Sequence, residues 1–145
     1  MRAVIRLIFL ITASLLGPSL NVARAEVVVV VDAASGIERL TQDQVINIYL
    51  GRHRKLPTGI AALPVDLPPL DKLRAEFYRK LVDKDLSEIN AYWARLYFSG
   101  KTTPPMQANS TAEVLRHVTG KAGGIAYLDK SQIDPRMRIV YSFPQ

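Results

Sequence analysis

The chain contains no cysteine and no hydrophobic run long enough to span a bilayer. Without a thiol it cannot form disulfides, bind a metal through thiolates, use a cysteine nucleophile or carry a lipid on cysteine. The strongly apolar stretch 7–16 is about half the length of roughly twenty residues that a spanning helix needs. These absences predict a domain whose stability comes from its own packed core.

Catalytic and metal-binding patterns are also scarce. The two histidines, His53 and His117, stand far apart in sequence and have no neighbour at metal-ligand spacing. Neither the G-x-S-x-G turn of serine hydrolases nor the phosphate-binding P-loop is present. Asp66 and Asp71 flank two prolines and are expected to lie in a solvated loop. We therefore expect a protein that is not an enzyme and that holds no metal or cofactor.

The N-terminal residues have the features of a secretory signal. Arg2 and Arg6 precede the apolar run 7–16, Pro18 ends it, and Ala23-Arg24-Ala25 places small residues where a signal peptidase reads them. This arrangement predicts a signal peptide over 1–25, cleavage after Ala25 and a single domain, 26–145, in the periplasm. An uncleaved membrane anchor is the alternative that the same residues leave open.

The sequence is basic, with 19 lysines and arginines against 13 acidic residues and a net charge of +6. Half of that net charge belongs to the three arginines within 1–25, so the domain 26–145 is only mildly positive. A mild positive charge suits an anionic small ligand or a polyanionic surface. Nucleic acid is not expected as a partner, because the predicted compartment is the cell envelope.

Two hydrophobic periodicities alternate along 26–145. Apolar runs of strand length predict strands, and apolar residues spaced by three or four predict helices. Strands are expected at 26–31, 60–67, 123–128 and 137–143, and helices at 41–50, 70–81, 86–98 and 110–119. The run 26–31 does not alternate, which indicates a strand buried on both faces. The expected fold class is α/β, a single domain with a mixed sheet flanked by about four helices.

Local signals set the ends of these elements. Thr41, with a glutamine three residues later, and Ser110, with a glutamate three residues later, both match the capping box. Gly51 is expected to end the first helix in a left-handed conformation. Pro64 places the strand 60–67 near a sheet edge or a bulge.

Two clusters admit both a structural and a binding interpretation. Arg52–Lys55 follows a helix end, where cations are favoured by the helix dipole, so the cluster is either a cap and exit turn or an anion-binding group. Trp93 lies at core spacing and is interpreted as a packing anchor. Tyr92 and Tyr97 flank it, and a platform for carbohydrate or a protein partner is the alternative.

Anion binding has better candidates elsewhere. Arg74 stands one turn into a helix and could reach a carboxylate or phosphate with its planar guanidinium, or simply be solvated. Ser110 and Thr111 offer hydroxyls beside the free amides of a helix start, and Ser35-Gly36 is a second candidate of this kind. Ordinary helix capping explains the hydroxyls at helix starts equally well.

Four segments together resemble the periplasmic phosphate-binding proteins of ABC transporters. "LTQDQVINIYLGR" resembles their L-T-x-x-x-(V/L)-x-x-I-(F/Y)-L-G-(K/R) segment, and "KAGGIAYLD" is similar to P-G-A-I-G-Y-(V/A), with Lys121 and Ala126 as departures. "RAEFYRKLV" resembles the helix after their ligand loop, and "YWARLYFSGKTTPP" a stretch of the short members. The resemblance implies a single periplasmic-binding-protein-like lobe.

The ligand loop departs from the family pattern. The family's Ser-Gly-Thr-Arg run, which contributes hydroxyl, amides and guanidinium to phosphate, corresponds here to "DKLR", in which only Arg74 matches. Asp71 would place a carboxylate beside the anion, and a carboxylate accepts hydrogen bonds without donating any. A protonated oxyanion, which can donate to Asp71, remains compatible.

The resemblance implies non-catalytic binding of a small oxyanion such as phosphate, handed to a membrane transporter. A single lobe offers half a cleft, so we expect weak binding or a homodimer that supplies the other half. The alternative is a periplasmic adaptor or sensory module that has lost phosphate binding and contacts an envelope sensor or transporter protein. The ligand-binding residues expected from the sequence are Arg74, Ser35, Gly36, Ser110 and Thr111.

Overall fold

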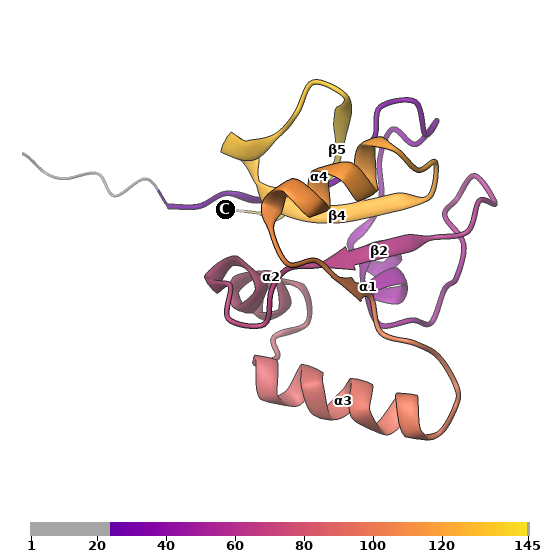
Figure 1. Ribbon diagram of the computed structural model, residues 1–145, viewed down its shortest axis with the longest axis vertical. Coiled ribbons are helices and arrows are strands. Elements are labelled where there is room, and N and C mark those ends of the chain that lie inside the picture. Colours follow the sequence, from indigo (N-terminus) through magenta and orange to yellow (C-terminus); the bar gives the residue numbers. More distant parts are fainter. Residues whose placement is uncertain (1–23, 145) are drawn as a thin grey trace, which may run out of the picture.

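The computed structural model describes residues 24–144 (Figure 1). The predicted signal peptide lies almost entirely outside these residues. In chain order the elements are β1 Val27–Asp32, α1 Gln42–Tyr49, β2 Leu63–Asp66, α2 Lys72–Val82, α3 Leu86–Phe98, β3 Met106–Gln107, α4 Thr111–Thr119, β4 Gly124–Asp129, a short 3-10 turn Lys130–Gln132 and β5 Met137–Ser142. Within the described part of the chain, none of the helices has the length and apolarity needed to cross a membrane.

The strands form one mixed sheet in the order β3-β2-β4-β1-β5. β2 runs parallel to β3 and β4, whereas β1 runs antiparallel to both β4 and β5. All five valines of 27–31 are at most 1% exposed, because β1 has a neighbour on each side and helices above and below. The expected mixed sheet and the strand buried on both faces are confirmed.

Helices cover both faces of this sheet. Figure 1 shows α4 in front of β4, with α1 and the fainter α2 behind the sheet. α4 contacts β4, β1 and β2, and α2 contacts β1 and β4. On the α2 side, the ring of Phe77 stacks on Tyr127 of β4 with centroids 3.7 Å apart, and Tyr49 of α1 meets Phe77 edge-on. α3 lies outside this layer and packs against α2.

The second strand is shorter than the sequence predicts. β2 covers Leu63–Asp66, because residues before it form a turn closed by an isolated bridge between Lys55 and Ala61. β2 is also not an edge strand, since β3, a two-residue strand where the sequence predicts neither strand nor helix, pairs outside it. Pro64 is tolerated because β3 pairs only with Val65 and Asp66, so Pro64 has β4 alone as its neighbour.

The helix ends follow the local signals in part. Thr41 and Gln44 form the expected reciprocal capping box at α1. At α4, Ser110 accepts from the amide of Glu113, but the Glu113 carboxylate turns to the amide of Asn109, so the second box is not reciprocal. The predicted start of the helix 70–81 is wrong, because α2 starts after Asp71 and Leu70 is 96% exposed.

The basic residues after α1 form its exit turn. Gly51 has a left-handed φ of +69°, as expected, and the amides of Arg52 and His53 both donate to the carbonyl of Asn47. Arg54 donates from Nη2 to the carbonyl of Lys101 at 2.8 Å. These hydrogen bonds close the turn after α1, as predicted for a cap and exit turn.

Candidate functional site

Two helices begin at the sheet edge where the parallel strands β2 and β4 end. Leu67 follows β2 and Asp129 ends β4, and both line a cavity of about 330 Å³. The first turn of α2 and Thr111, the first residue of α4, also line this α2–α4 cavity. Because the first amides of a helix lack intrahelical acceptors, two helix starts around one cavity favour an acceptor-rich or anionic ligand.

The side chains around the α2–α4 cavity work against that preference. Asp71 caps α2 by accepting from the amide of Leu73 at 2.8 Å, so its carboxylate occupies the place an anion would take. Asp129 accepts from both the amide and the hydroxyl of Ser131. Glu76 adds a third carboxylate to the lining, against the single cation of Lys72. The cavity wall is therefore negative overall.

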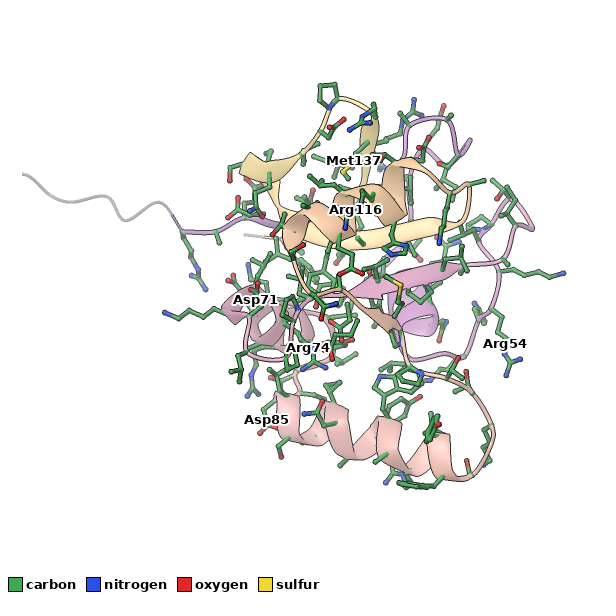
Figure 2. All side chains as sticks on the ribbon, viewed as in Figure 1. Arg54, Asp71, Arg74, Asp85, Arg116 and Met137 are labelled. Carbon is green, nitrogen blue, oxygen red and sulfur yellow. The ribbon has the colours of Figure 1, made fainter. Side chains whose placement is uncertain are left out.

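Arg74, which the sequence offered as an anion ligand, points away from solvent into the protein. Its Nε donates to Oδ2 of Asp66 at 2.9 Å, and the two side chains are 6% and 7% exposed. Its Nη2 donates to Oδ1 of Asn90 on α3 at 3.3 Å, and its guanidinium lies over the ring of Tyr78. Figure 2 shows Arg74 close to Asp71, at the start of α2. The guanidinium is thus already paired with a carboxylate.

Asp66 is the centre of a buried hydrogen-bond network. Besides Arg74, its carboxylate accepts from the hydroxyls of Tyr78 and Tyr127 and from the amide of Leu67. Burial, followed by the charge of Asp66, raises the pKa of the Tyr78 and Tyr127 hydroxyls well above the ordinary value. Both tyrosines therefore stay protonated and remain donors to the carboxylate.

This network corrects the expectation that Asp66 lies in a solvated loop. Asp66 is 5% exposed because it is the last residue of β2 and faces the following helix. Sequence reasoning missed it, although one signal was present: an acidic residue ends an apolar strand, with an arginine eight positions later in the next helix. Such a pair is placed to meet when the helix packs back on the sheet.

The structure separates the residues that sequence analysis grouped as anion ligands. Ser35 and Gly36 follow β1, which runs antiparallel to β4, so they lie at the opposite edge from the α2–α4 cavity. They do not begin a helix, and the Ser35 hydroxyl accepts from the amide of Ile37. Ser110 caps α4, and Thr111 alone of the proposed hydroxyl ligands lines the cavity.

A larger cavity lies at the opposite edge, where β2 begins and α1 and α4 end. Its lining includes His53 and His117, which the sequence places far apart. Among the described residues no group of three or more histidine or acidic side chains is arranged to hold a metal ion.

Comparison with known proteins identifies the fold. A protein of Clostridium perfringens, described as a phosphate ABC transporter substrate-binding protein with bound phosphate, matches with a TM-score of 0.65 and 15% identity over 80% of this chain and 44% of that one. An ABC-type phosphate transport receptor from Vibrio cholerae matches with a TM-score of 0.64 and 15% identity over 83% of this chain and 49% of its own. No protein-family model and no curated protein sequence matches the chain.

The chain therefore has the α/β fold of one lobe of a periplasmic binding protein. It spans slightly less than half the length of each of the two phosphate-transport proteins. The resemblance found in the sequence is confirmed at the level of the fold.

Proposed function

We propose that the chain is a non-catalytic binding protein of the periplasm that takes a small oxyanion, phosphate first, and works with a membrane transporter component. The observation that carries this proposal is the α2–α4 cavity, on which the starts of two helices converge in a fold shared with a phosphate-bound protein. Both solved neighbours are described as transport or substrate-binding proteins, which supports binding rather than catalysis.

The charges of the cavity define the form of the ligand. Asp71, Glu76 and Asp129 accept hydrogen bonds but donate none, so they disfavour a fully ionised phosphate. Dihydrogen phosphate can donate its own hydrogens to these carboxylates while the amides of Thr111 and its neighbours face its oxygens. We therefore expect weak binding that strengthens toward mildly acidic pH, with a second copy of the chain completing the cleft.

Thermal unfolding with and without phosphate tests this proposal. A ligand at a hundred times its dissociation constant adds about 2.7 kcal/mol, which raises the midpoint by several degrees in a domain of this size. Phosphate should raise the midpoint more than equal concentrations of sulfate or chloride, and Lys72→Gln should remove the difference. Lys84→Gln, which changes an exposed lysine paired with Glu88 at the start of α3, is the matched control. Equal midpoints in all three salts would reject the proposal.

A second function is favoured by the buried ion pair of Arg74 and Asp66. Because the family's phosphate-binding guanidinium is already occupied, the lobe can serve as an interaction module for an envelope sensor or transporter protein. The exposed aromatic pair at the end of α3, Tyr97 at 61% and Phe98 at 87% exposure, supplies a surface for such contact.

Site-specific photocrosslinking in cells separates the two functions. A crosslinking residue at Phe98 should capture a defined envelope protein, and one at Leu70, which is also strongly exposed but lies in the loop before α2, should not. The same crosslinked product from both positions would reject the interaction function. If Phe98 gives no product and phosphate raises the unfolding midpoint, only the oxyanion function remains.

A further inference from the structure

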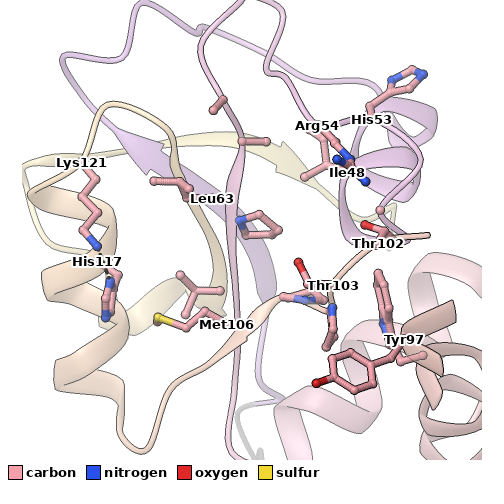
Figure 3. A pocket seen from close by; sticks show the side chains of 18 of the residues that line it. Ile48, His53, Arg54, Leu63, Tyr97, Thr102, Thr103, Met106, His117 and Lys121 are labelled. Atoms are coloured by element: carbon pink, nitrogen blue, oxygen red, sulfur yellow. Dashed lines mark hydrogen bonds between the residues drawn. The ribbon is translucent and has the colours of Figure 1, made fainter. Parts of the chain in front are cut away.

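The larger cavity, which we call the α1–α4 cavity, has a volume of about 670 Å³. The ends of α1, α3 and α4 surround it, together with the segment that leads into β2 and the loop before β3 (Figure 3). A volume of this order suits an organic molecule and is far larger than a phosphate ion requires.

The charged side chains that line the α1–α4 cavity are all positive. Its described lining includes Arg54, Lys121 and the two histidines, and none of the residues that line it is acidic. Figure 3 shows Lys121 and His117 on one side of the cavity and Arg54 on the other. Lys121 Nζ lies 3.3 Å from Nδ1 of His117, and Arg54 uses only Nη2 for its contact with Lys101, so each side keeps donors for a ligand.

Two helix ends at the α1–α4 cavity disfavour an anion. The carboxyl ends of α1 and α4 each carry about half a negative charge from their unpaired carbonyls. Arg54 follows the first of these ends and Lys121 the second, and each has a full positive charge. The basic residues therefore outweigh the helix ends and leave the cavity attractive to anions.

The middle of the cavity is apolar. Leu63 and Met106 lie between the two basic sides in Figure 3, and they are 45% and 39% exposed, unusually high for large apolar side chains. Trp93 forms part of the wall, and its indole N–H is buried without a hydrogen-bond acceptor among the described residues. Because this N–H is buried, Trp93 presents its ring rather than its N–H to the cavity.

The geometry points to a binding site for an elongated organic anion that has acidic groups at both ends of an apolar body. One acid group pairs with the guanidinium of Arg54, and the other with the ammonium of Lys121. The body covers Leu63 and Met106 and removes their apolar surface from water. This site shares no lining residue with the α2–α4 cavity, so its test is independent of phosphate binding.

Trp93 is the single tryptophan of the chain and reports on this cavity directly. Straight-chain dicarboxylates from succinate to sebacate, which do not absorb where tryptophan is excited, should change its fluorescence in a saturable way. Affinity should rise with chain length to an optimum, because only a sufficient length reaches both basic sides. The neutral diamide of the optimal acid should bind at least about tenfold more weakly, the factor that corresponds to about 1.4 kcal/mol.

Charge variants locate the site. Arg54→Gln and Lys121→Gln should each weaken binding of the optimal dicarboxylate by about fivefold or more, in the range of a charge-assisted hydrogen bond. Both side chains are exposed, so the fold should persist, which circular dichroism verifies. Lys84→Gln, at the far end of α3, should bind like the unaltered protein. The inference is overturned if no acid gives a saturable change, if the diamide binds equally well, or if Lys84→Gln loses as much affinity as Lys121→Gln.

Discussion

At the scale of single residues, the ion pair of Arg74 and Asp66 determines whether a guanidinium is available to an anion near the α2–α4 cavity. A buried guanidinium and a buried carboxylate are stable only together, because either charge alone would lose its hydration without compensation. Here the hydroxyls of Tyr78 and Tyr127 donate further hydrogen bonds to Asp66, and Asn90 accepts one from Arg74. The arginine that could have reached an external anion is thus part of the support of the fold.

We expect Arg74→Met to destabilise the protein by about 3–5 kcal/mol, because it leaves the Asp66 carboxylate buried without its cation. Adding Asp66→Asn should restore part of this loss, since the second change removes the unpaired charge. Urea unfolding of the unaltered protein, both single variants and the double variant gives the coupling free energy. Additive losses, with no recovery in the double variant, would show that the two side chains do not stabilise each other.

At the scale of elements, α3 packs against α2 and is also held to the turn that follows α1. The hydroxyl of Tyr92 donates to the carbonyl of Leu50 at 2.6 Å, and Trp93 packs over the turn that follows. Gly51 allows this contact in two ways. Its φ of +69° favours glycine, and a Cβ there would lie 2.8 Å from Trp93 Cη2 and 3.1 Å from the Thr102 side chain.

Gly51→Ala should therefore be more costly than an alanine at another left-handed glycine. Gly59 has a φ of +85° but nothing within 4 Å of its Cβ position, so Gly59→Ala reports the backbone strain alone, about 1–2 kcal/mol. Gly51→Ala adds overpacking against Trp93, which costs about 1–3 kcal/mol more. Thermal unfolding of the two variants measures the difference. Equal midpoints would mean that Trp93 moves aside freely.

At the scale of the whole molecule, three tyrosines from three elements meet in the core between the sheet and the α1–α2 layer. Tyr49, Tyr78 and Tyr127 are fully buried. Burial is the main cause that raises the pKa of each hydroxyl well above its usual value, and the negative charge of Asp66 raises it further. The fold can therefore hold these side chains only in their neutral form.

This arrangement predicts alkaline unfolding. In the unfolded chain a tyrosine has a pKa of about 10, and the folded-state values are higher, so the contribution of the neutral hydroxyls is complete below about pH 10 and declines as the pH rises further. Tyrosinate absorbance and circular dichroism followed together should show these three tyrosines ionising only as the helices unfold. Complete ionisation of all six tyrosines in a protein that keeps its native spectrum would contradict the prediction.

The sequence by itself determined the class of fold and most of the elements. The unbroken valine run, the capping box at Thr41 and the left-handed Gly51 depend on residues within a few positions of one another, and all three appear in the structure as expected. The segment motifs also identified the lobe, because the positions that define its helices and turns are local.

Only the tertiary structure decided which side chains meet. β2 and α2 had to pack together before Asp66 could reach Arg74, and the antiparallel course of β1 placed Ser35-Gly36 at the opposite edge from Thr111. His53 and Lys121, separated by most of the domain, share one cavity only because α1 and α4 end at the same edge. Charge placement of this kind depends on strand order and direction, which local sequence patterns do not encode.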